Sequence, residues 1–157
     1  MKKFKLTSEF IVDISGVKLF RIKALIEFGN VKAGDLGGYI EKEENLSHMG
    51  NAWVSGNAQV SGDARVFGNA RVSGDAQVFG DARVSGDKDY AYAHGFGSCN
   101  RTTTFFRLKD GDVGVRCGCF YGTLAQFRDN VCETHGETKK AQEYLMLADL
   151  MDFRFKN

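Results

Sequence analysis

Between Gly50 and Ser85 the apolar and polar residues follow one pattern with a period of six. Each hexad places Gly first, Asn or Asp second, Ala third and Val fifth, while the fourth residue is Trp, Gln or Arg. The Ala and the Val lie two residues apart, so they face the same side of a short strand. The Gly-Asn or Gly-Asp pair supplies a turn, because these residues tolerate positive φ at little cost. Each hexad is therefore predicted to form one strand and one corner, which bury their apolar face only by stacking on neighbours.

These repeats resemble the hexapeptide proteins that fold as left-handed parallel β-helices, in which three hexads make a triangular coil of about 18 residues. Stacking at that period aligns Gln59 with Gln77 and Arg65 with Arg83. The same phase continues backward through residues 38–46 and less clearly forward through residues 86–97, which gives about three coils. The alternative is an antiparallel roll of short hairpins, since Gly-Asn and Gly-Asp also occur in hairpin turns.

The segments on either side of the repeats have different patterns. Upstream, residues 10–25 indicate a β-hairpin over Ser15-Gly16. Downstream, residues 102–117 indicate a hairpin with Asp-Gly in its turn, and apolar spacing predicts helices after Thr123 and from about Thr138. The expected apolar face of the second helix contains Ala141, Tyr144, Leu145, Ala148, Leu150 and Met151.

The predicted fold class is mainly β: a left-handed parallel β-helix with an N-terminal β cap and a small C-terminal α+β domain. The expected domains are a β-hairpin cap over residues 1–37, a hexapeptide β-helix over 38–97 and a ββαα mini-domain over 98–157. A cap is expected because the end of a solenoid exposes unpaired strand edges.

Three segments extend the resemblance beyond the repeats. Residues 28–54, the run Gly118–Thr123 and the run Glu133–Gly136 look like segments of uncharacterised phage, prophage and bacterial proteins that carry the same hexapeptide array. The resemblance covers most of the chain and implies no reaction.

Charge and hydropathy narrow the range of partners. The chain has 21 basic and 20 acidic residues and a formal net charge of +1, which gives no bias toward extended nucleic acid. No apolar run has the length of a membrane span or the core of a signal peptide. We therefore expect a cytoplasmic protein, of a bacterium or a phage-infected cell, without membrane contact.

An acyltransferase is the first enzyme hypothesis, because hexapeptide β-helices include acyltransferases that use a histidine as base. His48 and His94 are the candidates near the coils. Both lie at the ends of the repeats without a loop insertion that could shape a cofactor tunnel. A capping or solvated histidine is the alternative interpretation.

The cysteines suggest a metal site. Zinc prefers four Cys or His ligands in closely spaced pairs, and Cys117, Cys119, Cys132 and His135 offer two such pairs. The alternatives are buried thiols and a nucleophilic Cys-His pair formed by Cys119 or Cys132 with His135. Apart from this zinc site, no cofactor is expected.

Arginine and phenylalanine side chains on the outer faces suggest a ligand surface, formed by Arg65, Phe67, Arg71, Phe79 and Arg83. Arginine and aromatic side chains together suit a nucleotide phosphate and base. The alternative is solvated arginines beside phenylalanines that form trimer contacts.

These observations predict a non-enzymatic binding or scaffold protein of phage or prophage type. It would self-associate through its β-helix faces as a homotrimer, and it would bind a host protein or a small anionic ligand, interfering with a host process. The alternatives are an anti-defence protein that sequesters a nucleotide signal and an acyltransferase-like enzyme.

Overall fold

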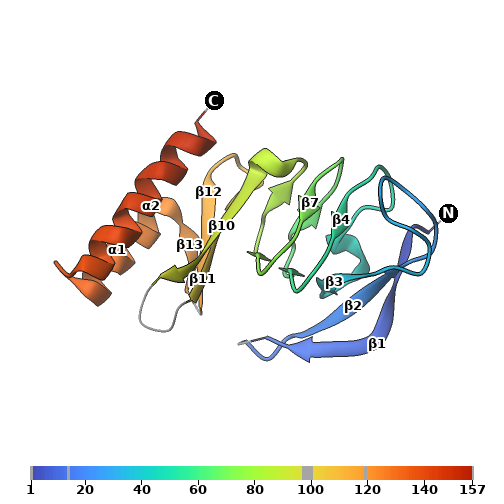
Figure 1. The fold of residues 1–157 in the computed structure, drawn as a ribbon. Helices are drawn as coiled ribbons and strands as arrows, with labels where there is room; N and C mark the ends of the chain where they lie inside the picture. Colours follow the sequence, from blue (N-terminus) through green and yellow to red (C-terminus); the bar gives the residue numbers. More distant parts are fainter. Residues whose placement is uncertain (1, 14, 97–100, 119, 157) are drawn as a thin grey trace.

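The computed structural model describes residues 2–13, 15–96, 101–118 and 120–156, and it is mainly β. A solenoid of stacked coils occupies the middle of the molecule (Figure 1). A long N-terminal hairpin lies along one side of the solenoid (Figure 1). An antiparallel sheet with two helices covers the C-terminal end of the solenoid (Figure 1). No helix among the described residues is long and apolar enough to cross a membrane.

Each hexad contributes one two-residue strand. The strands are β4 (Trp53–Val54), β5 (Gln59–Val60), β6 (Arg65–Val66), β7 (Arg71–Val72), β8 (Gln77–Val78) and β9 (Arg83–Val84). They pair in parallel with the strand eighteen residues further along, which aligns Gln59 with Gln77 and Arg65 with Arg83. This pairing confirms the predicted register, and it contradicts the alternative roll of antiparallel hairpins.

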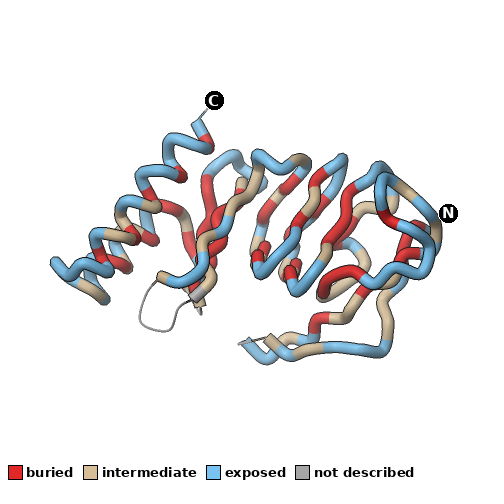
Figure 2. Tube along the Cα trace, in the orientation of Figure 1, coloured by how far each residue is buried: buried red, intermediate tan, exposed pale blue. Residues whose placement is uncertain are grey.

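The interior of the coils is formed by the alanines and valines of the hexads, as predicted. All six alanines and all six valines are at most 1% exposed. Figure 2 shows buried segments in the successive coils of the solenoid. Trp53 is the exception among the fourth positions: it is 3% exposed because Phe28 packs edge-on against its ring at 5.3 Å. The corners require glycine; Gly62 has a φ of +67°, and a Cβ there would lie 3.0 Å from the backbone nitrogen of Gly80.

The N-terminal strands join the solenoid through one shared sheet. These are β1 (Phe4–Val12), β2 (Lys18–Ala24) and β3 (Leu36–Ile40), followed by the short 3₁₀ helix η1 (Glu43–Asn45). The predicted hairpin over Ser15-Gly16 is confirmed as β1–β2. Strand β3 pairs antiparallel with β2 and parallel with β5, so the pairing changes direction at β3. Tyr39 pairs with Gln59 and Leu46 with Val66, which confirms that the coil begins before Gly50.

The C-terminal part is a four-stranded antiparallel sheet with two helices. The 3₁₀ helix η2 (Asp87–Asp89) leads into β10 (Tyr90–Phe96), β11 (Arg101–Arg107), β12 (Val113–Cys117) and β13 (Phe120–Thr123), in this order across the sheet. The two predicted helices follow as α1 (Leu124–His135) and α2 (Lys139–Phe155), with Thr123 and Thr138 as their N-caps.

Three expectations differ from this arrangement. The segment 86–97 was expected to prolong the repeats, but β10 pairs antiparallel with β11, because the Gly-Asn/Asp-Ala-x-Val pattern has ended there. The expected ββαα order lacks β10 and β13, whose short alternating segments gave a weak pattern. Leu150 was placed on the apolar face of α2, but it is 55% exposed because Ala148, Met151 and Phe155 take the core positions.

Candidate functional site

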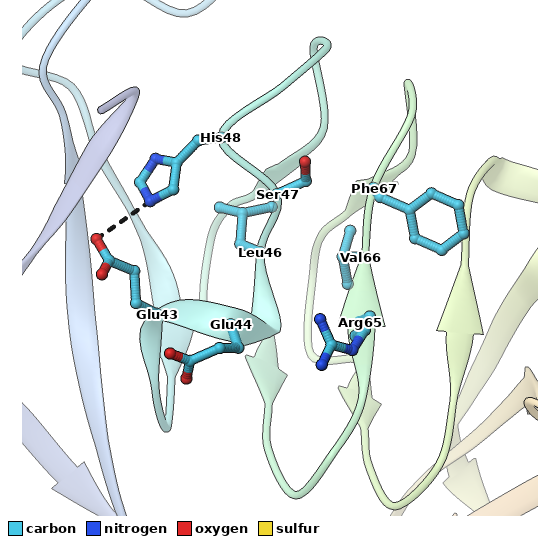
Figure 3. Close-up of a pocket in the computed structure, with 8 residues that line it drawn as sticks. All are labelled: Glu43, Glu44, Leu46, Ser47, His48, Arg65, Val66 and Phe67. Atoms are coloured by element: carbon cyan, nitrogen blue, oxygen red, sulfur yellow. Dashed lines mark hydrogen bonds and ion pairs between the residues drawn. The ribbon is translucent and has the colours of Figure 1, made fainter. Parts of the chain in front are cut away.

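The first hollow lies on the β6 face of the solenoid, where two of the predicted ligand residues meet His48. It measures ≈ 390 Å³ and is lined by Glu43, Glu44, Leu46, Ser47, His48, Arg65, Val66 and Phe67 (Figure 3). A serine, a histidine and a carboxylate in one hollow raise the possibility of nucleophilic chemistry, so their geometry decides whether the site can be catalytic.

Both ring nitrogens of His48 already have partners. The backbone N–H of Lys3 donates to Nδ1 at 3.0 Å, and Nε2 lies 3.1 Å from the Glu43 carboxylate. The imidazole also stacks on Phe4, with ring centroids 4.2 Å apart. The Ser47 hydroxyl accepts from the backbone N–H of Met49 at 3.0 Å and points away from the imidazole (Figure 3). A base needs a free nitrogen directed at its nucleophile. His48 has no such free nitrogen, so it does not act as a base. Its bonds to Lys3 and Glu43 instead join the N-terminal cap to the coil.

His94, the second candidate base, lies on β10. Its Nδ1 is 2.8 Å from the Thr102 hydroxyl on the paired strand β11, at an exposed position. The described residues around it supply no carboxylate partner.

The five predicted ligand residues lie on different sides of the solenoid. Arg65 and Arg83 stack on the β6–β9 face, and Phe67, at the corner that follows β6, is 39% exposed. Arg71 lies on the separate β4–β7 face. Phe79 is covered by the C-terminal sheet: the Arg116 guanidinium lies 4.1 Å from the centre of its ring, and Tyr121 packs edge-on at 4.9 Å.

The predicted zinc ligands are dispersed where they can be described. Cys117 is buried in the sheet, where it accepts from the Thr103 hydroxyl at 3.2 Å and lies 3.7 Å from the Tyr144 hydroxyl. Cys132 is exposed on α1, and His135 ends that helix beside Tyr144. Cys119 lies outside the described residues. Within the described part of the chain, no group of three or more His, Cys, Asp or Glu residues could hold a metal ion.

A second hollow lies where α2 ends beside η2 and the sheet, and we call it the cationic hollow. It measures ≈ 490 Å³, and the described residues that line it are all basic: Lys88, Arg107, Arg154 and Lys156. Lys88 comes from η2, Arg107 from the end of β11, Arg154 from the last turn of α2, and Lys156 is the C-cap of that helix. Residues distant in sequence thus bring four positive charges together.

Two of these four charges have carboxylate partners. Arg107 Nε lies 3.3 Å from Asp89, and Lys156 Nζ lies 3.6 Å from Asp152. Burial alone would raise the pKa of Asp89, but hydrogen bonds from Ser85 and Arg107 outweigh burial and lower this pKa below its ordinary value. Lys88 and Arg154 have no carboxylate partner among the residues that the structure describes, so the cationic hollow keeps an excess of positive charge.

A third hollow of ≈ 430 Å³ shares a lining residue with the cationic hollow, and we call it the edge hollow because β10 is the edge strand of its sheet. It is lined by Arg71, Ser73, Asp87, Tyr90, Ala91, Tyr92 and Arg154. Arg154 belongs to both hollows, and its Nη2 donates to the backbone carbonyls of Asp87 (3.1 Å) and Tyr90 (3.2 Å).

The cationic hollow could not be found from the sequence. Its lysines and arginines are isolated in the chain, without a basic run or a spacing that marks a site. Only Arg71 of the predicted ligand residues reaches the edge hollow.

Comparison with known proteins supports a β-solenoid repeat in the middle of the chain. A family model described as YdcK beta solenoid repeat matches residues 58–74 and 76–87, which contain β5 to β9. The chain is therefore similar to β-solenoid repeat proteins over its middle part. No curated protein matches the chain.

Proposed function

We propose that this chain is a non-enzymatic binding protein whose ligand carries a phosphate or a similar multiply charged anionic group. The observation that carries the proposal is the cationic hollow, in which Lys88, Arg107, Arg154 and Lys156 surround one space. Guanidinium groups offer paired donors that match phosphate oxygens, and ammonium groups add charge without fixed geometry.

The end of helix α2 explains only part of this cluster. Carbonyl groups at a helix C-terminus attract cations, and Arg107 donates to the carbonyl of Phe155 at 3.1 Å. Arg154 instead donates to carbonyls outside the helix, and Lys88 lies on η2. Arg154 and Lys88 thus add positive charge that does not serve to neutralise the C-terminus of α2. Because this charge lines a concave surface, it favours binding of an anion.

Binding without turnover is supported by the state of the candidate catalytic groups. His48 has both nitrogens engaged, and the Ser47 hydroxyl is directed elsewhere. A hydrolase or acyltransferase would need a base with a free nitrogen next to the reacting atom.

The proposal is tested by calorimetric titration of the full chain with inorganic pyrophosphate at low ionic strength. We expect binding that weakens with salt, since exposed charges are screened. The double variant Lys88→Gln with Lys156→Gln should weaken binding about tenfold or more, because each lost charge-assisted contact contributes about 1 kcal/mol or more.

The matched control is Lys139→Gln with Lys140→Gln, at the opposite end of α2. It removes the same number of positive charges, from exposed positions at the start of α2, so pyrophosphate affinity should stay at the wild-type value. No binding by the wild-type chain, or equal weakening in both double variants, would overturn the proposal.

For the coil, we propose the left-handed parallel β-helix. Three hexads per coil and an interior of alanine and valine support this hand, since hexapeptide repeats of this composition typify left-handed helices. A right-handed path in an experimental structure would refute it. The phage-type relationship and the homotrimer stay predictions, and sedimentation of the purified chain tests the trimer.

A further inference from the structure

We infer that the ligand is a nucleoside diphosphate, with its phosphates in the cationic hollow and its nucleoside in the edge hollow. This inference rests on the proposed function, because it assigns a ligand class to the same site. It adds the edge hollow as the place where the uncharged part of the ligand is recognised.

Arg154 lines both hollows. Its guanidinium Nη2 donates to the carbonyls of Asp87 and Tyr90, which fixes the position of the side chain. A guanidinium fixed by two backbone carbonyls is pre-organised, so less freedom is lost when its remaining N–H groups bind a phosphate. The hollows measure ≈ 490 Å³ and ≈ 430 Å³, so together they offer room for a ligand larger than a phosphate group.

The edge hollow offers the groups that a nucleoside needs. Tyr90 and Tyr92 lie two residues apart on β10 and so share one face of the sheet. Tyr92 is 41% exposed, and its hydroxyl packs against Gly74 of the solenoid, which fixes the ring at the wall of the hollow. Aromatic rings at an accessible wall suit stacking by a base.

Asp87 supplies an acceptor for the sugar. Its Oδ1 accepts from the backbone N–H of Arg71 at 3.1 Å, and its Oδ2 has no hydrogen-bond partner among the described residues. A carboxylate oxygen beside a nucleotide accepts from ribose hydroxyls. The cationic hollow thus offers cations for the phosphates, and the edge hollow offers a carboxylate for the ribose and tyrosines for the base.

Arg71 is not assigned to the phosphates. A Cβ on Gly29 would lie 2.8 Å from Arg71 Nη2, so its guanidinium extends toward the N-terminal cap. Its charge also contributes to the lowered pKa of Lys3, which places it near that buried ammonium.

The test compares ADP with inorganic pyrophosphate by calorimetry on the full chain. We expect ADP to bind the wild-type chain about tenfold more tightly than pyrophosphate, from stacking of the base. Tyr92→Leu should reduce ADP affinity to the level of pyrophosphate and leave pyrophosphate affinity unchanged, because leucine keeps bulk against Gly74 but removes the aromatic face.

Tyr121→Leu is the matched control. Tyr121 is 39% exposed, and its hydroxyl packs against Gly80 just as that of Tyr92 packs against Gly74, but it lies on β13 and outside the edge hollow. Its replacement should leave both affinities unchanged, with folding of each variant checked by circular dichroism.

The outcomes separate the two claims. If pyrophosphate binds and ADP binds no more tightly, the nucleotide inference is overturned and the proposed function stands. If the advantage of ADP survives Tyr92→Leu, or is lost equally in Tyr121→Leu, the edge hollow does not hold the nucleoside and the inference is again overturned. If neither probe binds, both claims are overturned.

Discussion

The buried lysine Lys3 closes the N-terminal end of the solenoid by donating to a carbonyl that has no preceding coil to pair with. Residues of one coil donate N–H groups to carbonyls of the next coil, as Trp53 does to the Ala70 carbonyl at 3.0 Å. The carbonyls of the first coil therefore need donors from elsewhere. Lys3 Nζ donates to the Ala52 carbonyl at 2.6 Å and lies 4.6 Å from the centre of the Phe28 ring. This arrangement satisfies a buried carbonyl, but it also removes an ammonium from water.

We predict that Lys3 makes stability rise with pH. Burial first, and the charge of Arg71 second, lower the pKa of Lys3 from 10.5 to about 8. Between these pH values the unfolded chain binds more protons than the folded chain, so the free energy of unfolding increases as pH rises from about 8 toward 10.5. The increase should be at most about 3 kcal/mol, measured by urea unfolding across this range.

Lys3→Met removes the titrating group and should flatten this part of the profile. Lys5→Met changes an exposed lysine two residues away and should keep the wild-type slope. Parallel profiles for the wild-type chain and Lys3→Met would contradict the assignment.

Among the elements, both ends of the stacked coils need other segments to satisfy backbone groups that have no further coil to pair with. At the C-terminal end, both N–H groups and carbonyls of the last coil have such partners. Asp87 accepts from the N–H of Arg71 at 3.1 Å, and the Thr104 hydroxyl accepts from that of Gln77 at 2.9 Å. Donors act at this end as well, since the Tyr90 hydroxyl donates to the Arg71 carbonyl at 2.6 Å and the Lys109 N–H donates to the Asp81 carbonyl at 2.9 Å.

The predicted elements are determined by sequence patterns within each segment, whereas the missed elements depend on contacts with distant segments. The hexads were predictable because Gly62, Ala64 and Val66 each have one role set by a period that repeats along the chain. Strand β10 was missed because its pairing depends on β11, not on its own sequence. The location of the cationic hollow depends on the docking of α2 beside η2, which no local pattern encodes.

Val66→Asp tests the coil as an element. Val66 is fully buried, and an unpaired carboxylate there costs several kcal/mol, comparable with the whole stability of a small domain. We expect loss of the β signal in circular dichroism. Arg65→Asp places the same carboxylate one residue earlier, on the outer face, and should unfold at nearly the wild-type temperature. A folded Val66→Asp chain would refute the inward position of the hexad valines.

For the whole molecule, the N-terminal hairpin connects the two ends of the solenoid. Its strands begin beside the first coil, and Figure 1 shows the hairpin extending along the solenoid in the direction of the C-terminal sheet. There Asp13 Oδ2 lies 3.6 Å from Arg116 Nη2, with the side chains only 3% and 4% exposed. Burial lowers the pKa of Arg116, and the charge of Asp13 partly offsets this effect. The pair therefore joins segments about a hundred residues apart in the chain.

Because Arg116 Nε has no hydrogen-bond partner among the described residues, the Asp13 carboxylate is its main compensation. Removing one partner of a buried pair leaves an uncompensated charge, whereas replacing both is often nearly neutral. We predict that Asp13→Ala destabilises the chain by about 3 kcal/mol and that Asp13→Ala with Arg116→Met recovers most of this loss in urea unfolding. Glu9→Ala, which breaks the more exposed pair with Arg21 inside the hairpin, should cost less than about 1 kcal/mol.

Hydrogen exchange tests whether the Asp13–Arg116 pair holds the hairpin to the C-terminal sheet or only stabilises the residues around it. If the hairpin is held at both ends, Asp13→Ala should speed exchange along β1 and β2 while the amides of β5 and β8 keep their protection, since their bonds lie within the stacked coils. Uniform acceleration in all these strands would mean that hairpin and coils open only together. No change in β1 and β2 would mean that the Asp13–Arg116 pair does not hold the hairpin to the C-terminal sheet.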